Sequence, residues 1–307
     1  MTAATVAGPR SIRGLTLLLA LSLHVAAAGG SAAQDLRILS YDTELGLPSN
    51  LTKDVLQDVD GFVWIATDAG LVRFDGRTFA TYGVADGLPS GYVKRLFLTR
   101  QRQLLAVTDL GVVEVRRDGA AVAFAPFLAG SEVVTDSTAY YPKAVFQDWN
   151  DALWVGDARS VFRVDDRGVR RYAFPEDAWS SSFTRAFSFA EDDWGRLLVA
   201  SATGHLFYLD RTADAFRPLP VRSRRAFGEV HALLRRPDGT IWVGGDAGIY
   251  ALKMHADIDS TAWTPHIDLP GVHVLHEDRK GNVFIGTTLT GLYRLAPGQA
   301  VPRPYAA

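Results

Sequence analysis

The sequence has 307 residues, of which 48% are hydrophobic and 21% are charged, a balance typical of a folded protein and not of a disordered chain. It contains no cysteine, which excludes disulfides, thiol catalysis and thiolate metal sites. The formal net charge is −2, so the concentrated positive charge of nucleic-acid binders is missing and nucleic acid is not an expected partner.

The N-terminal residues 1–33 are predicted to be a secretory signal peptide. Two arginines precede an apolar stretch at 15–28, and small side chains at 31–33 suit a cleavage site. The apolar stretch is short for a bilayer span, which needs about 20 residues, so an uncleaved anchor is the weaker alternative. We therefore expect a periplasmic domain over residues 34–307, with no membrane span in the mature chain.

Residues 37–41 form a strand-like stretch, and Gly46-Leu47-Pro48 follows it. The same combination returns 41 residues later, as residues 78–82 followed by Gly87-Leu88-Pro89. We expect the first copy to be an outer strand that completes the sheet of the last repeat and closes a ring. Residues 300–305 compete for that place. One of the two would then be displaced, or the ring has a further partial blade, or the chain is the front part of a longer protein.

Residues 51–82 predict a meander of four short strands. An apolar pair at 55–56 is followed after a turn by strands at 62–67, 71–74 and 78–82. A sheet of this size is marginally stable by itself, so neighbouring sheets must cover its two apolar faces.

This unit recurs along the chain at intervals of 41 to 49 residues. The position of Trp64 is taken in turn by Leu105, Trp154, Leu198, Trp242 and Phe284. A glycine suited to a tight turn follows in five copies, at Gly70, Gly111, Gly204, Gly248 and Gly291, and Ser160 stands in the third copy. The repeats predict an all-β fold, a β-propeller of four-stranded antiparallel blades that is six-bladed or an incomplete seven-bladed ring. Trp64, Trp154 and Trp242 are expected between blades.

Several stretches carry a resemblance to a known family. They are Gly46-Leu47-Pro48-Ser49-Asn50 and residues 57–67 and 70–76, with weaker forms at 148–164 and 238–252. The chain resembles the two-component regulator propeller repeat, which occurs in periplasmic sensor regions of hybrid histidine kinases and related regulators. The resemblance implies a sensory role, with saccharides a frequent ligand class. The family's β-sandwich, membrane span, cytoplasmic domains and usual seven repeats per ring have no counterpart here, so it implies binding but not phosphotransfer.

The residue at the start of each predicted innermost strand suggests a binding site. These residues are Lys53, Lys94, Lys143, Phe187, His231 and His273. Five basic or protonatable groups would ring the mouth of a central channel, where they would attract an acidic sugar, another anionic small molecule or a partner's carboxylates. The competing interpretation is that strand starts are ordinary solvated places for lysine.

The connections between repeats add aromatic and basic side chains that suit stacking on sugars or anchoring a protein partner. They are Tyr140, Tyr141, Trp179, Arg185, Arg224, Arg225 and Trp263. Packing of their own loops is the equal alternative.

Metal and cofactor sites are not expected. Asp58-x-Asp60-Gly61 lacks the later bidentate carboxylate of a calcium loop, so its aspartates indicate turn chemistry. His273 and His276 lie three apart on a predicted strand and would point to opposite faces, which excludes chelation by that pair.

The leading prediction is a non-catalytic, ligand-binding sensor propeller, since no nucleophile elbow, metal motif or phosphate loop is present. One alternative is a propeller enzyme that acts on polysaccharide as a lyase or hydrolase, with His231 and His273 as the best catalytic guesses. The other is a scaffold for protein partners or for downstream signalling domains.

Overall fold

The computed structural model describes residues 39–131, 135–180, 187–220 and 228–305. Tyr41–Ala307 form one compact unit, separate from Met1–Ser40. The predicted signal peptide and residues 37 and 38 of the stretch 37–41 lie outside the described residues. None of the helices in the described ranges is long and apolar enough to cross a membrane.

Within the described residues, twenty-four strands form six antiparallel sheets of four, and each sheet keeps its strands in chain order. Blades 1 to 3 consist of β1 (Thr52–Gln57), β2 (Val63–Thr67), β3 (Gly70–Phe74), β4 (Phe79–Tyr82), β5 (Val93–Leu98), β6 (Leu104–Thr108), β7 (Gly111–Asp118), β8 (Ala121–Ala129), β9 (Ala144–Gln147), β10 (Leu153–Gly156), β11 (Ser160–Asp165) and β12 (Gly168–Ala173). Blades 4 to 6 consist of β13 (Phe187–Glu191), β14 (Leu197–Ser201), β15 (Leu206–Asp210), β16 (Ala215–Pro218), β17 (Val230–Arg235), β18 (Ile241–Gly245), β19 (Gly248–Lys253), β20 (Ala262–Ile267), β21 (Val272–Glu277), β22 (Val283–Thr287), β23 (Leu292–Leu295) and β24 (Arg303–Pro304).

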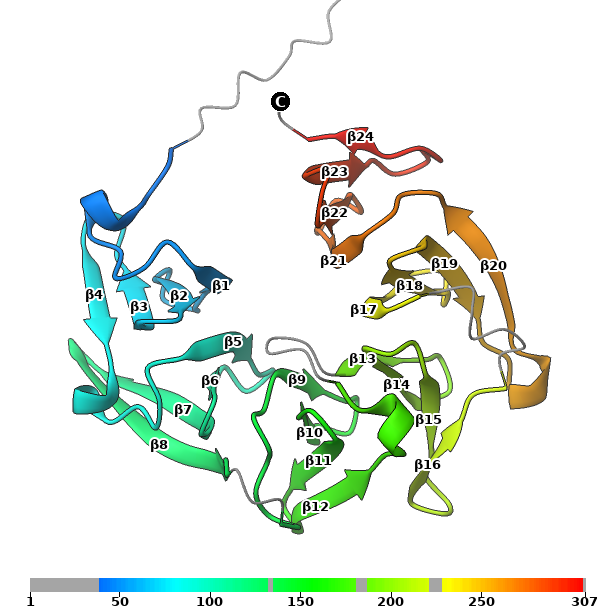
Figure 1. The fold of residues 1–307 in the computed structure, drawn as a ribbon, viewed down its shortest axis with the longest axis horizontal. Helices are drawn as coiled ribbons and strands as arrows, with labels where there is room; N and C mark the ends of the chain where they lie inside the picture. Colours follow the sequence, from blue (N-terminus) through cyan, green and yellow to red (C-terminus); the bar gives the residue numbers. More distant parts are fainter. Residues whose placement is uncertain (1–38, 132–134, 181–186, 221–227, 306–307) are drawn as a thin grey trace, which may run out of the picture. The chain divides into compact units, whose positions relative to one another are not determined.

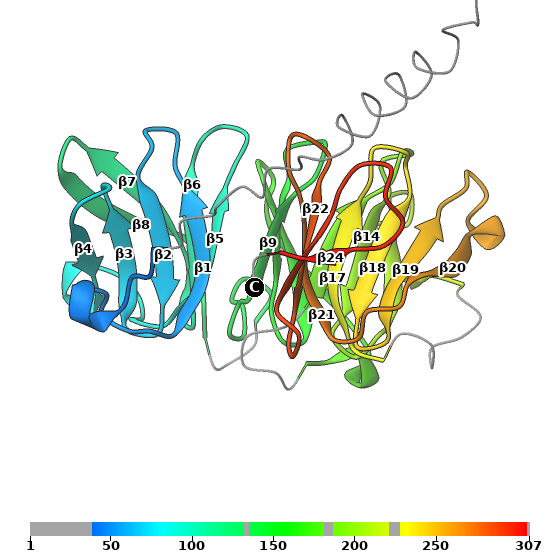
Figure 2. The ribbon, with the colours of Figure 1, turned by 90° about the horizontal axis from the view of Figure 1, so that it is seen from above.

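The six sheets are the blades of a β-propeller, which confirms the predicted fold class. Figure 1 shows them following one another around a common axis, with the first strand of each blade innermost. Figure 2 shows the same blades from a direction at right angles to that view, with the strands running along the axis. The start of every innermost strand therefore lies at one end of the channel, and the turn that ends it lies at the other.

The tryptophans of the repeat lie between blades, as predicted. Trp64 and Trp154 are fully buried and Trp242 is 5% exposed. The Nε1 of Trp64 donates to Asp58 Oδ2 at 2.8 Å, and the other carboxylate oxygen of Asp58 accepts two backbone N–H groups of the same turn. The turn interpretation is confirmed for Asp58, which also orients the core indole of Trp64.

The glycines of the repeat have positive φ angles, as the turn prediction requires. At Gly111, with φ of +132°, a Cβ atom would lie 2.6 Å from the carbonyl oxygen of Leu128. Any side chain here would force the two outer strands of blade 2 apart.

The Gly-Leu-Pro motif has the same structure in both copies. It follows a single 3₁₀ turn, η1 (Thr43–Leu45) in the first copy and η2 (Val84–Asp86) in the second. The glycine after each turn has a φ near +100°, and the leucine that follows is buried, Leu47 at 6% and Leu88 at 2% exposure.

The expectation that residues 37–41 complete the last blade is wrong for the part of this stretch that the structure describes. The outer strand of blade 6 is β24, which pairs with β23 and is followed by Tyr305, whose ring meets Phe284 at 5.2 Å. Tyr41 instead packs on blade 1, with its ring 5.2 Å from that of Phe74. The short pairing of Arg303–Pro304 already occupies the edge that the N-terminal strand would have needed.

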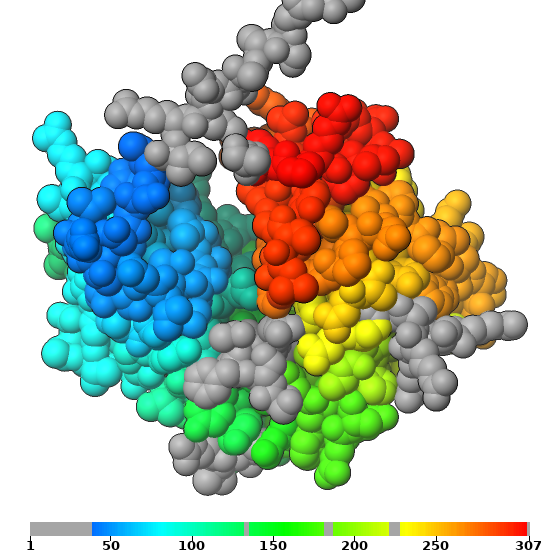
Figure 3. All heavy atoms as spheres, turned by 45° about the horizontal axis from the view of Figure 1, so that its top comes forward, coloured from blue at the N-terminus to red at the C-terminus, as the bar shows by residue number. Residues whose placement is uncertain are grey.

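The first and last blades lie apart, as Figures 1 and 3 show by the blue and red ends of the colour scale. Val55 of β1 is 59% exposed and Val274 of β21 is 52% exposed. Phe284, which holds the Trp64 position in blade 6, is only half-buried. Each end of the series of six blades therefore presents an apolar face that is incompletely covered within the described residues.

Candidate ligand-binding channel

Four of the predicted ring residues occupy β-bulges. In β1, β5, β17 and β21 the pairing with the next strand skips one residue, and that residue is Lys53, Lys94, His231 or His273. A bulge leaves its residue outside the hydrogen-bond ladder and re-aims the side chain. The same irregularity in four blades thus orients the side chains at the strand-start mouth, which we define as the channel end carrying these residues and Lys143.

Two of the three lysines of this mouth lie over tyrosines of the following blade. The Nζ of Lys53 is 5.4 Å from the ring centre of Tyr92, and the Nζ of Lys94 is 5.4 Å from that of Tyr141. Lys94 is 4% exposed and forms an ion pair with Asp109, in the turn after the second strand of its blade. Cation–π contact and ion pairing together stabilise a buried ammonium group.

Lys143 is also 4% exposed, and its burial, together with the charge of Lys94, lowers its pKa to about 8. Burial raises the pKa of Asp157, although three backbone N–H groups, that of Tyr140 among them, donate to its carboxylate. Carboxylates therefore stand close to the buried lysines, which reduces the net positive charge of the mouth. Attraction of an anion by this ring stays a prediction.

The two histidines of the ring lie together. The rings of His231 and His273 stack with centres 4.8 Å apart, and His231 Nε2 is 3.0 Å from Asp246 Oδ1. Both line a cavity of about 240 Å³ between the inner strands, together with Arg95, Ala144, Val145, Phe146, Phe187, Ser188, Phe189, Ala232, Leu233, Val274 and Leu275.

The aromatic residues predicted in the connections do not form one cluster. The guanidinium of Arg159 lies 4.2 Å from the ring centre of Tyr140 and 5.0 Å from that of Trp179, so these two pack around their own loop. Trp263 lies on β20, the outer strand of blade 5, against Tyr250. Tyr141 is the member that reaches the lysine ring. Arg185, Arg224 and Arg225 lie outside the described residues.

A second pocket, of about 500 Å³, lies where the inner strands end. It is lined by Arg100, Phe146, Gln147, Trp149, Phe189, Ala190, Glu191, Leu233, Leu234 and Arg235. We call it the turn-side pocket. Trp149 is 49% exposed, and Arg235 lies 5.4 Å from its ring centre. An exposed indole beside guanidinium and amide groups is suited to stacking on the face of a polar ring.

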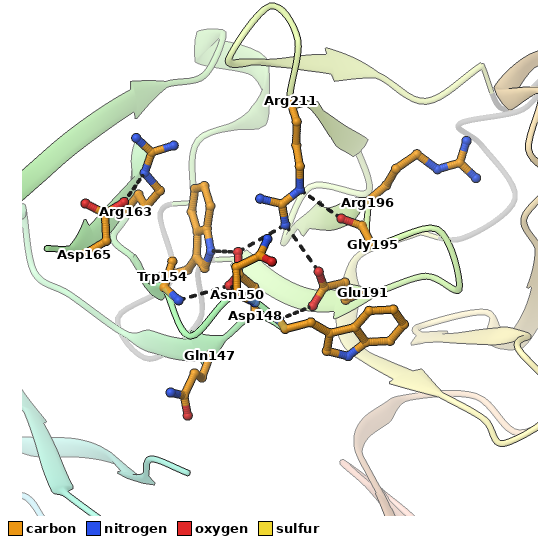
Figure 4. Close-up of polar contacts among 12 residues, drawn as sticks. Gln147, Asp148, Asn150, Trp154, Arg163, Asp165, Glu191, Gly195, Arg196 and Arg211 are labelled. Carbon is orange, nitrogen blue, oxygen red and sulfur yellow. Dashed lines mark hydrogen bonds and ion pairs between the residues drawn. The ribbon is translucent and has the colours of Figure 1, made fainter. Parts of the chain in front are cut away.

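Behind this pocket lies a buried pair of carboxylates, shown in Figure 4. Arg211 bridges them, with its Nη2 at 3.2 Å from Asp148 Oδ2 and 3.3 Å from Glu191 Oε1. The backbone N–H of Trp149 donates to Glu191 Oε2 at 2.7 Å, and the indole of Trp154 donates to Asp148 at 3.0 Å. Burial, with the nearby charge of Asp148, raises the pKa of Glu191. These contacts fix the turn that presents Trp149.

The turn-side pocket was not among the predicted sites. A signal was available, because Trp149 follows a turn aspartate directly, where a polar residue is usual. Glu191 gave no comparable signal, since it simply ends a strand. Its burial depends on Arg211, twenty residues away in the chain.

No family model and no curated protein sequence matches the chain. Solved structures do. The extracellular domain assigned to a hybrid two-component system of B. thetaiotaomicron matches with a TM-score of 0.65 and 18% identity, over 87% of this chain and 37% of that one. A second such domain from the same organism gives 0.64 and 17%, over 83% and 36%. The chain thus spans little more than a third of these structures.

An enzyme of similar fold also matches. A catalytically inactive variant of virginiamycin B lyase from Staphylococcus aureus, with quinupristin, gives a TM-score of 0.60 and 10% identity over 83% of each chain. At these identities the likeness shows the fold alone, a β-propeller.

Proposed function

We propose that Tyr41–Ala307 is the recognition propeller of an extracytoplasmic sensor and binds a small polar ligand, of the saccharide class, in the turn-side pocket. The observation that carries the proposal is Trp149, an exposed indole that lines the turn-side pocket, is flanked by Arg235 and has its backbone held by the buried carboxylate of Glu191. The fold of the B. thetaiotaomicron domains supports the sensory setting. Export through the N-terminal segment belongs to the same proposal.

The test is isothermal titration calorimetry with a panel of neutral and uronic-acid oligosaccharides. For any member that binds, Trp149→Ala is expected to weaken affinity about tenfold or more, because loss of one aromatic stacking contact costs about 1.5 kcal/mol. Trp194→Ala is the matched control, since Trp194 is 51% exposed in the equivalent turn of blade 4 but does not line the turn-side pocket. Equal loss in both variants, or no binding across the panel, contradicts the proposal.

A second candidate function is catalysis on the propeller scaffold. The stacked His231 and His273 rings and the match to a lyase favour it. The test is incubation with quinupristin and with the same oligosaccharides, followed by mass spectrometry. Turnover that His273→Ala abolishes would establish an enzyme, whereas the sensor proposal expects intact compounds.

A further inference from the structure

Blade 5 departs from the side-chain pairing that blade 2 shows at the strand-start mouth. In blade 2 the bulge residue is Lys94, and its ammonium pairs with Asp109 in the next turn. In blade 5 the equivalent residues are His231 and Asp246. An imidazole, which can act as a metal ligand, therefore stands where blade 2 has a built-in cation.

A second carboxylate accompanies this change. Glu229 lies two residues before His231, a position held by Tyr92 in blade 2 and by Tyr141 in blade 3. The backbone N–H of Asp246 donates to the carbonyl of Glu229 at 3.1 Å, and the backbone N–H of Glu229 donates to Asp246 Oδ2 at 3.2 Å.

We propose that Glu229, His231 and Asp246 bind one divalent transition-metal ion of the zinc class. One ligand atom from each residue lies within 4.8 Å of the other two. Zinc holds imidazole nitrogen and carboxylate oxygen at about 2.0 to 2.2 Å in a tetrahedral arrangement, so two ligand atoms on one ion lie about 3.4 Å apart. The side chains of Glu229 and Asp246 are both exposed, and side-chain rotations that move their carboxylate oxygens by about 1 to 1.5 Å bring the three ligand atoms to this spacing.

The surroundings divide the ligands into a fixed one and two adjustable ones. The side chain of His231 is 2% exposed and stacks on His273, so its imidazole is held in place. The side chain of Asp246 is 56% exposed. An ion bound here would meet solvent on the carboxylate side, which leaves a coordination position for water or for an anionic ligand entering the channel.

The simpler alternative is that His231 and Asp246 form only a hydrogen-bonded pair, the counterpart of Lys94 and Asp109. His231→Lys separates the two interpretations, because it restores the side chain of blade 2 and supplies an ammonium in place of an external cation. This variant is expected to fold, since blade 2 shows that the same bulge accepts lysine beside aspartate.

The experiment is calorimetric titration of the purified protein with Zn²⁺ in a buffer that does not bind metal. We expect one saturable site per chain, at least 100-fold weaker in His231→Lys and at least tenfold weaker in Glu229→Gln. His276→Ala, which removes an exposed histidine of β21 outside the site, is expected to bind as the wild type does.

Two results would overturn the proposal. One is the absence of a saturable zinc site in the wild-type protein, and the other is wild-type affinity in His231→Lys or, should that variant not fold, in Glu229→Gln. Because the probe is the metal ion alone, the outcome does not depend on whether the turn-side pocket binds a saccharide.

Discussion

The side chains at the starts of the inner strands show how one repeat position acquires different chemistry from blade to blade. Lys94 is ion-paired over a tyrosine, Lys143 is buried beside another lysine, and His231 stacks on His273. The sequence identified these positions because the repeat is regular. It could not identify the bulges or the partners, since Asp109 and Asp246 are recruited from turns 15 residues further along the chain.

The lowered pKa of Lys143 predicts a dependence of stability on pH. Its pKa falls from 10.5 to about 8 on folding, so between these values the unfolded chain binds more protons than the folded one. The contribution of Lys143 to the free energy of unfolding therefore rises with pH across that window. Relative to Lys143→Met, the wild type should gain on the order of 1–2 kcal/mol between pH 7.5 and 9.5.

Urea unfolding of both proteins at several pH values measures this difference. A constant gap between the two proteins from pH 7.5 to 9.5 would mean that the ammonium group is solvated, and would remove Lys143 from the buried part of the mouth.

At the scale of the elements, the first turn of blades 1 and 3 is a structural unit in which an aspartate holds both the turn and the core tryptophan. In blade 3, Asp148 is fully buried and accepts from the indole of Trp154 and from the backbone of Asn150 and Ala152. The sequence predicted the turn from its residue types. The indole contact could not be predicted, because it depends on how the tryptophan packs between two sheets.

Asp148→Asn tests this unit. An amide nitrogen in place of Oδ2 would face two donors, Trp154 Nε1 and Arg211, so we expect a loss of about 2–3 kcal/mol in the free energy of unfolding. Asp58→Asn in blade 1 is the comparison, and it should cost less because the side chain of Asp58 is 8% exposed whereas that of Asp148 is fully buried. Chemical denaturation measures the loss of unfolding free energy in each variant. Equal losses would show that burial of the turn aspartate does not matter.

For the whole molecule, the repeat interval predicted the six blades and the places of the core tryptophans, because each small sheet needs neighbours to bury its faces. The sequence left ring closure open, and its preferred solution was wrong. Whether β24 or the N-terminal stretch takes the last edge depends on contacts of Tyr305 and Tyr41 with particular rings, which no repeat pattern encodes.

Substitutions at equivalent positions in blades 5 and 6 test how far the incompletely covered face of blade 6 lowers the stability contributed by its core residue. Trp242 is covered by the residues of blade 6, so Trp242→Ala is expected to cost about 3–5 kcal/mol of unfolding free energy. Phe284 lies on the incompletely covered face of blade 6, so Phe284→Ala should cost about 1–2 kcal/mol. Thermal and urea unfolding measure both losses. A loss of similar size in the two variants would show that the face of blade 6 is covered, which contradicts this account.

Hydrogen–deuterium exchange with and without the tightest-binding oligosaccharide tests the recognition site most directly. We predict added protection at the ends of β9, β13 and β17 and in the turn at Trp149, the segments that line the turn-side pocket. Protection confined to the outer strands, or no change on saturation with ligand, would contradict a binding site at that end of the channel.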